Sequence, residues 1–259
     1  KKGLFKNIHA IHSGTQWDWH RHVRPGDRIY RIEGNESVEV KKSEFAGQTV
    51  VTVSRAIAIN QDGEIVAIMR QSQHRTERET AGKRGKYKDI TPASYTDAEI
   101  AEIDKIYARE QVQGSQPRYW EDVEIGDSLG RMAKGPLTVS DIIAFHMTGV
   151  AQVPWGFAPG RLGYQRRMKM PAAYVKDMQG IPDLVMRMHW DNDWAKGMGS
   201  PMAYDYAMQR DFWVYHYLTD WCGDNGIVTR MFTQMRKFNY IGDTQIVTGE
   251  VVGKRMEGT

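Results

Sequence analysis

The sequence His189-Trp190-Asp191 places an imidazole two residues before a carboxylate. Histidine suits general acid–base chemistry because its unperturbed pKa lies near neutrality, and a neighbouring carboxylate can orient it. We therefore consider His189 a candidate general base, with Asp191 or Asp183 as its carboxylate partner. Each residue also has a structural interpretation: His189 can be bonded within a loop, Asp191 can cap the turn after it, and Asp183 can be a turn residue.

A long aromatic segment, residues 200–221, follows this motif. It has the length of a helix, and its bulky apolar residues cannot all share one face: Met202, Tyr206, Phe212, Trp213, Leu218 and Trp221. A helix that is apolar on every side must be enclosed. Strand-like runs at 227–238 and 244–252 follow it, so we predict an α+β fold in which an antiparallel sheet wraps around a buried helix. His189 would then lie near the N-terminal end of this helix.

The bulk composition sets only broad limits. The chain has 259 residues, of which 41% are hydrophobic, enough for one large domain or two of ordinary size. The net charge of +3 does not indicate a nucleic-acid-binding protein. The single cysteine, Cys222, excludes an intrachain disulfide framework and suits a reducing cytoplasm. Because the sequence contains neither a membrane-spanning apolar run nor a signal-peptide core, we expect a cytoplasmic protein without a membrane partner.

The first part of the chain is rich in predicted strands. These strands are expected at 17–24, 28–40, 49–59 and 64–73. Asn60-Gln61-Asp62-Gly63 is a strong hairpin-turn signal between the last two. Together, the segments predict an antiparallel meander.

The character of the sequence changes after this meander. A mixed-charge stretch at 75–90 predicts a solvated linker. Thr96, with Glu99 three residues later, predicts the start of a helix that continues to about residue 112. Residues 150–182 are rich in glycine and proline, which predicts loops. Gly-Asp corners flanked by hydrophobic residues recur in both parts, which hints at two related halves.

Two segments resemble a known family. Residues 120–148, WEDVEIGDSLGRMAKGPLTVSDIIAFHMT, resemble the opening of a MaoC-like acyl-CoA dehydratase domain. Residues 17–78, with an aromatic strand, a Pro-Gly-Asp turn and the Asn-Gln-Asp-Gly hairpin, resemble the FAS1-like dehydratase N-terminal domain. The resemblance implies a double hotdog, in which each half wraps an antiparallel sheet around a long helix.

The resemblance also implies a division of the chain. We expect a partial N-terminal hotdog at 1–78, a charged linker with a bridging helix at 79–116, and a MaoC-like hotdog at 117–259. The first half lacks a helix of its own before the strand near residue 17, and the strand expected after Gly253 is missing. We therefore expect truncation at both ends, or missing parts that are supplied elsewhere.

The family's catalytic signature, Asp-x-Asn-Pro-hydrophobic-His, is incomplete here. His189 fits the signature histidine, and the segment after it also resembles the family. Leu184 stands at the aspartate position and Met186 at the asparagine position. The resemblance implies that His189 is the base, while the acid is not evident from the signature.

The resemblance also assigns the stabilisation of the thioester oxygen to the entrance of the long helix. Backbone N–H groups at a helix N-terminus suit this role. The family's pattern places it on the Asp205 N–H or on Tyr206. Tyr204 could donate a hydrogen bond to the substrate, or it could be a core aromatic. The Asp205 carboxylate could replace the missing acid.

A basic cluster precedes His189 in the sequence. Arg166, Arg167 and Lys169 could bind the phosphates of coenzyme A, or they could belong to a solvated loop. The histidines show no spacing typical of metal ligands, so we expect neither a metal nor a cofactor beyond the coenzyme A of the substrate.

These observations lead to a specific functional expectation. We predict an enoyl-CoA hydratase or 3-hydroxyacyl-CoA dehydratase that acts as a homodimer or pairs with another hotdog chain. Two alternatives remain open: a non-catalytic acyl-thioester-binding or structural subunit, and an acyl-CoA thioesterase.

Overall fold

The computed structural model describes residues 8–43, 47–77, 90–150 and 160–256. Its strands are β1 (Ile8–Trp19), β2 (Tyr30–Ser43), β3 (Gly47–Ile59), β4 (Ile65–Glu77), β5 (Ser128–Lys134), β6 (Tyr174–Lys176), β7 (Pro182–Leu184), β8 (Arg230–Gln234) and β9 (Gln245–Glu250). Its α-helices are α2 (Asp97–Tyr107), α3 (Val139–Phe145), α4 (Gly160–Lys169), α5 (Asn192–Gly197) and α6 (Ala207–Cys222). Short helical turns are η1 (Trp120–Asp122), η2 (His146–Val150), η3 (Pro171–Ala173) and η4 (Val185–His189).

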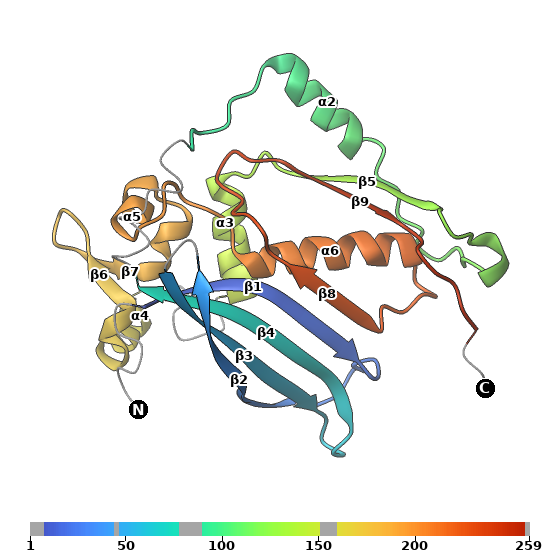
Figure 1. Ribbon diagram of the computed structural model, residues 1–259, viewed down its shortest axis with the longest axis horizontal. Coiled ribbons are helices and arrows are strands. Elements are labelled where there is room, and N and C mark those ends of the chain that lie inside the picture. Colours follow the sequence, from blue (N-terminus) through green and yellow to red (C-terminus); the bar gives the residue numbers. More distant parts are fainter. Residues whose placement is uncertain (1–7, 44–46, 78–89, 151–159, 257–259) are drawn as a thin grey trace.

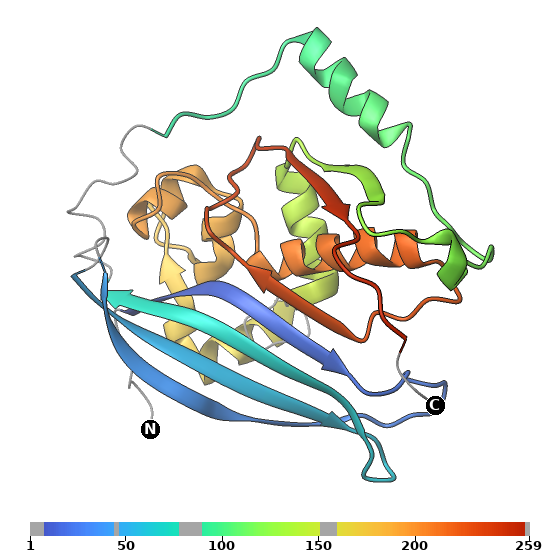
Figure 2. The same cartoon turned by 45° about the vertical axis from the view of Figure 1, so that its right-hand side comes forward.

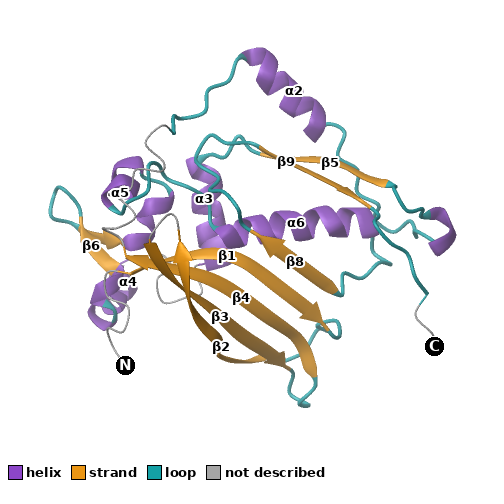
Figure 3. Ribbon diagram, viewed as in Figure 1, coloured by secondary structure: helices purple, strands orange, loops and turns teal. Residues whose placement is uncertain are grey.

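The main sheet joins the two parts of the chain. Its strand order is β2-β3-β4-β1-β8, and every neighbouring pair is antiparallel. Four strands come from the first 77 residues, whereas β8 comes from the second part and pairs with β1. The smaller pairs β5-β9 and β6-β7 complete the strand content. Figures 1 and 3 show the curvature of the main sheet.

Helix α6 lies between the main sheet and the β5-β9 pair (Figures 1 and 2). Its contact with the sheet includes a buried polar group: Asp211 accepts hydrogen bonds from the Thr15 hydroxyl at 2.7 Å and the Thr233 hydroxyl at 2.5 Å. The Tyr215 ring also packs against Trp19 of β1, with centroids 5.3 Å apart. At its other side, the Tyr217 hydroxyl donates to the Gly130 carbonyl at 2.8 Å. These bonds fix the position of α6 between the two sheets.

Local sequence signals account for several boundaries. The Asn60 side-chain oxygen accepts hydrogen bonds from the N–H groups of Asp62 and Glu64, which builds the predicted hairpin turn. The predicted Thr96–Glu99 capping box is present at the start of α2. The α+β prediction, with antiparallel sheets curved around a long helix, is confirmed.

Other boundaries differ from the predictions. The first strand begins at Ile8 and ends at Trp19, so the strand predicted at 17–24 is wrong for most of its length. Strand β4 continues to Glu77 and takes the start of the predicted linker, while residues 78–89 lie outside the described residues. Helix α2 ends at Tyr107 rather than near residue 112, and residues 160–169 form α4 rather than a loop.

The aromatic segment is neither fully helical nor fully enclosed. Residues 201–206 precede α6, and Tyr204 forms an isolated bridge with Tyr240. On α6 itself, Phe212 is 55% exposed and Tyr215 is 39% exposed. The prediction that every side of this helix is covered is therefore wrong within the chain.

No described helix combines the length and the apolar composition that a membrane-spanning segment requires.

Candidate active site

The candidate site forms where η4 meets the entrance of α6. His189 is the last residue of η4 and is buried, with 8% of its surface exposed. Two apolar residues anchor η4: Leu184 before it is 4% exposed, and Met188 belongs to a core cluster. Met186 packs against a second core cluster that includes Tyr206. The two positions at which the family signature has Asp and Asn therefore serve packing in this chain.

The Tyr204 carbonyl determines the proton arrangement of His189. His189 Nδ1 lies 2.8 Å from the Tyr204 carbonyl oxygen. A carbonyl oxygen only accepts hydrogen bonds, so Nδ1 must be protonated and act as the hydrogen-bond donor. In the neutral ring the lone pair is then on Nε2, which is the atom that can act as a base.

Two tyrosines hold the imidazole ring in place. The His189 ring stacks on the Tyr206 ring, with centroids 3.9 Å apart, and meets the Tyr204 ring edge-on at 4.8 Å. Tyr206 is the N-cap residue of α6 but makes no side-chain cap bond. The imidazole is therefore in direct contact with the entrance of α6. The sequence predicted His189 near the N-terminal end of this helix.

A second histidine, His146, extends this cluster. The Tyr206 hydroxyl and His146 Nδ1 are 2.7 Å apart, and the His146 side chain is fully buried. Burial raises the pKa of Tyr206 and lowers that of His146, so both are neutral near pH 7. Sequence reasoning missed His146. The available signal was its spacing: His146 lies four residues after Ile142, which puts both side chains on one face of a helix. Both residues are buried.

Asp205 is a buried carboxyl next to this cluster. Its Oδ2 atom lies 2.9 Å from Arg210 Nε and accepts a hydrogen bond from the Asn239 amide at 3.1 Å. Its Oδ1 atom has no hydrogen-bond partner among the described residues. Burial raises the pKa of Asp205 to about 7, and the Arg210 charge only partly offsets this effect. A carboxyl with this pKa can carry a proton near neutral pH.

The Asp205 backbone is less available than expected. Its N–H donates to the Asn239 carbonyl at 2.9 Å, so the predicted oxyanion donor already has an acceptor. The N–H groups of Ala207 and Met208 lie in the first turn of α6, where a helix offers no internal acceptor. These two N–H groups are therefore the better candidates for an anion or an oxyanion.

The predicted carboxylate partners of His189 converge on Arg187. The Arg187 guanidinium donates to Asp191 at 2.9 Å and to Asp183 at 3.2 Å, and it also pairs with Asp177 at 3.5 Å. Asp191 additionally caps α5 by accepting from the Trp194 N–H. Burial alone would raise the pKa of Asp191, but the Trp194 N–H and Arg187 outweigh it and lower the pKa. Arg187 and Asp191 line a cavity of about 460 Å³ that does not include His189 among its lining residues.

This geometry predicts a mainly structural role for Asp191. Asp191→Ala should lower the free energy of unfolding by about 1 kcal/mol through loss of the cap. Asp191→Asn keeps a capping side chain and should lose less. Chemical denaturation measures both, and turnover should fall less than tenfold in either variant, a margin of about 1.4 kcal/mol. A folded Asp191→Asn variant without turnover would instead make Asp191 part of the chemistry.

The basic cluster lies on a helix. Arg166, Arg167 and Lys169 occupy the last turn of α4, where cations also complement the helix dipole. Arg167 lies over the Tyr164 ring at 5.9 Å. Their assignment to coenzyme A phosphates stays a prediction. Within the described ranges, no group of three or more His, Cys, Asp or Glu side chains is placed to hold a metal ion.

Comparisons with known proteins identify the fold. Residues 5–69 match the family model described as the FAS1-like, dehydratase domain region. A solved MaoC-like dehydratase is 17% identical, with a TM-score of 0.54 over 90% of this chain and 61% of that one. A putative MaoC domain protein dehydratase from Chloroflexus aurantiacus J-10-fl is 13% identical, with a TM-score of 0.49 over 94% and 60%. A MaoC-like dehydratase from Phytophthora capsici is 10% identical, with a TM-score of 0.47 over 92% and 60%.

The comparisons leave the activity open. No curated protein matches the sequence. The chain spans about three fifths of the length of the solved structures it resembles. At these identities the likeness concerns the fold, which is the hotdog fold of the MaoC-like dehydratases, as predicted.

Proposed function

We propose that this chain, which has the fold of the MaoC-like dehydratases, adds water to an enoyl-CoA thioester or removes it from the 3-hydroxyacyl thioester. The tautomer and the position of His189 are the main support for this function. His189 Nδ1 donates a hydrogen bond to the Tyr204 carbonyl, so the basic lone pair of the neutral ring is on Nε2. The same ring stacks on Tyr206, the N-cap residue of α6. A fixed base next to the first-turn N–H groups of a helix is the arrangement that this reaction requires.

In the hydration direction, His189 Nε2 would take a proton from water as the water oxygen adds to C3. The electron pair of the double bond moves towards the thioester carbonyl, and negative charge collects on its oxygen. The Ala207 and Met208 N–H groups and the positive end of the α6 dipole would stabilise this charge. Proton delivery to C2 completes the addition, and dehydration follows the same path in reverse.

Asp205 is the candidate for the proton donor that the signature lacks. Its raised pKa, about 7, keeps a substantial protonated fraction under neutral conditions. Its backbone adjoins Tyr204, whose carbonyl holds His189. The hydrogen bond to Tyr204 would orient the imidazole as the base, and burial would keep the Asp205 carboxyl protonated as the acid.

Charge reversal on α4 tests whether this helix binds the phosphates of coenzyme A. The double variant Arg166→Glu, Arg167→Glu should raise KM for CoA thioesters about tenfold or more, because each phosphate contact contributes roughly 1 to 3 kcal/mol. Steady-state kinetics measures this effect. Lys41→Glu, Lys42→Glu is the matched control for the change in net charge, because both lysines are exposed on β2. An unaltered KM in the α4 variant rules out the phosphate assignment.

A non-catalytic acyl-thioester-binding subunit is the second candidate. It is favoured by Leu184 and Met186, which serve packing at the signature positions, and by the ties of Asp183 and Asp191 to Arg187. Exposed Phe212 and Tyr215 also suit a helix that another hotdog chain covers. A third possibility, thioester hydrolysis, could use the same base and oxyanion donors.

A mass-spectrometric assay with a panel of enoyl-, 3-hydroxyacyl- and saturated acyl-CoA thioesters distinguishes the three functions. Gain or loss of one water on an intact thioester supports the proposed hydro-lyase. Release of free CoA indicates a thioesterase. Binding without any mass change indicates the subunit alternative and contradicts the proposal.

A further inference from the structure

A second cluster of titratable side chains involves the second half of α6. Lys134 is the last residue of β5, and His216 and Asp220 are one turn apart on α6. Lys134 Nζ is 2.9 Å from His216 Nδ1, and His216 Nε2 is 3.1 Å from Asp220 Oδ2. His216 and Asp220 lie 9 and 13 residues after Ala207, the first residue of α6, which places them about 14 and 20 Å along the helix from its entrance. The cluster is therefore distinct from the site around His189.

The donors and acceptors in this cluster follow one direction. A lysine ammonium can only donate, so His216 Nδ1 must accept from it. The ring proton of neutral His216 is then on Nε2, which points to the Asp220 carboxylate. The order is amine, imidazole, carboxylate, the same sequence of roles in which a histidine activates a nucleophile and a carboxylate stabilises the imidazolium.

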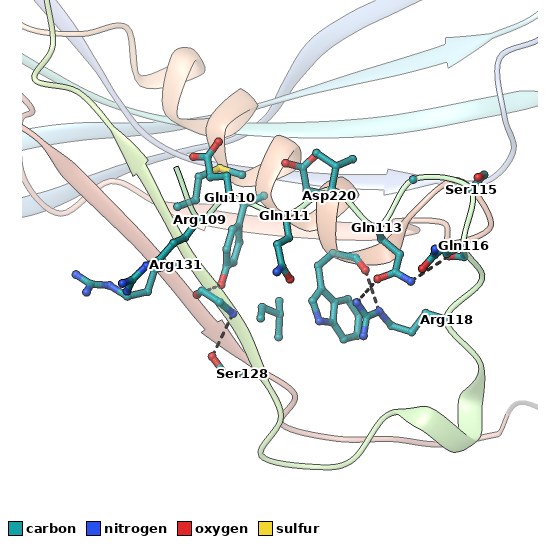
Figure 4. Close-up of a pocket in the computed structure, with 17 residues that line it drawn as sticks. Arg109, Glu110, Gln111, Gln113, Ser115, Gln116, Arg118, Ser128, Arg131 and Asp220 are labelled. Atoms are coloured by element: carbon teal, nitrogen blue, oxygen red, sulfur yellow. Dashed lines mark hydrogen bonds between the residues drawn. The ribbon is translucent and has the colours of Figure 1, made fainter. Parts of the chain in front are cut away.

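The cluster adjoins a large cavity between the segment after α2, strand β5 and helix α6. The cavity has a volume of about 800 Å³, and its lining includes Asp220, Glu110 and Met132 (Figure 4). Met132 is on the same face of β5 as Lys134, two residues later in the strand. Glu110 Oε1 is buried and has no hydrogen-bond partner among the residues with described positions. Of the three residues of the cluster, Asp220 lines the cavity itself, whereas Lys134 and His216 lie beside it and are not among its lining residues.

The environment of Lys134 also favours the free amine. Burial lowers the pKa of Lys134, although the negative charges of Glu110 and Asp220 oppose the shift. A larger fraction of this lysine is therefore a neutral nucleophile at a given pH than of a fully solvated lysine.

From the hydrogen-bonded order Lys134–His216–Asp220 beside this cavity, we propose that Lys134 is a site of acylation by small acyl thioesters. The amine nitrogen attacks the thioester carbonyl carbon, a C–N bond forms and the C–S bond breaks. One of the two protons lost from the ammonium leaves through His216 to solvent, and the other ends on the departing thiolate. The products are an amide on Lys134 and a free thiol, so the step needs no oxidant or reductant. It does not depend on turnover at His189.

Incubation of the full chain with acetyl-CoA, followed by peptide mass spectrometry, tests this proposal. We expect Lys134 to be acetylated roughly tenfold or more faster than Lys42, an exposed lysine of β2 that serves as the internal reference. The variants His216→Ala and Asp220→Asn should each lower the rate at Lys134 several-fold and leave the rate at Lys42 unchanged. His216 is about half exposed, so its truncation should leave the fold intact.

Two results would overturn the assignment. The first is acetylation of Lys134 no faster than that of Lys42 in the unaltered chain. The second is an unchanged or higher acetylation rate at Lys134 in His216→Ala. Such a rate would mean that the amine needs no activation by His216 and that the ring only limits access to it. A circular-dichroism melt of each variant verifies that the comparison is between folded proteins.

Discussion

Hydration of an enoyl-CoA thioester should be roughly 10²- to 10⁴-fold slower when His189 is replaced by alanine, the range typical for loss of a general base. The physical reason is the fixed proton arrangement of the ring. The Tyr204 carbonyl holds the proton on Nδ1, so only Nε2 can accept a proton from water or from the substrate. Steady-state measurement of kcat gives the result directly.

Because His189 is buried, its replacement also needs a variant that preserves packing. His189→Gln retains an amide that can donate to the Tyr204 carbonyl but has no basic nitrogen, so it should be nearly as inactive as His189→Ala. His20→Ala, at an exposed histidine, is the control and should keep full turnover. Full turnover in folded His189→Ala would remove His189 from the mechanism.

The second large effect concerns stability as a function of pH. The Asp205 pKa is raised from 3.8 to about 7 in the folded chain. The folded state therefore holds a proton on Asp205 between about pH 4 and 7, where the unfolded chain has released it. This contribution to stability is fully present below pH 4 and is lost as the pH rises through 7. A shift of this size corresponds to a change on the order of 4 kcal/mol across that window.

Asp205→Asn removes this titration and isolates its effect. Relative to the variant, the unaltered chain should lose stability steadily between pH 4 and 7 and then remain at a constant difference. Urea unfolding at a series of pH values measures the two curves. Asp193→Asn, at an exposed carboxylate, is the control and should run parallel to the unaltered chain. Parallel curves for Asp205→Asn would show that Asp205 ionises as an ordinary carboxylate.

Much of the fold could be predicted because its signals are local. The Asn60–Gly63 turn and the Thr96–Glu99 capping box depend on side chains that bond to backbone within four residues. The start of β1 could not be predicted in this way. The face turned to α6 carries Thr15, which donates to Asp211 at a separation of 196 positions, so apolar alternation on this face becomes visible only at Trp17 and Trp19.

The candidate site could be predicted only in part, for a similar reason. The order of His189 and the helix entrance was readable because η4 and α6 are close in sequence. The ion pairs of Asp183 and Asp191 with Arg187 were missed, although each carboxylate lies four residues from Arg187, a spacing at which opposite charges can pair. The pKa of Asp205 is raised by burial and is partly lowered by Arg210 and by the distant Asn239, and no local pattern indicates the burial.

If the thioester reacts at His189 Nε2 beside the entrance of α6, a crystal structure with a bound, unreactive enoyl-CoA analogue should show it there. We expect C3 of the analogue to lie within reach of Nε2 through one water, with the thioester oxygen at the Ala207 and Met208 N–H groups. An analogue bound with its acyl part away from His189, for example in the cavity between β5 and α6, would exclude His189 as the base of this reaction.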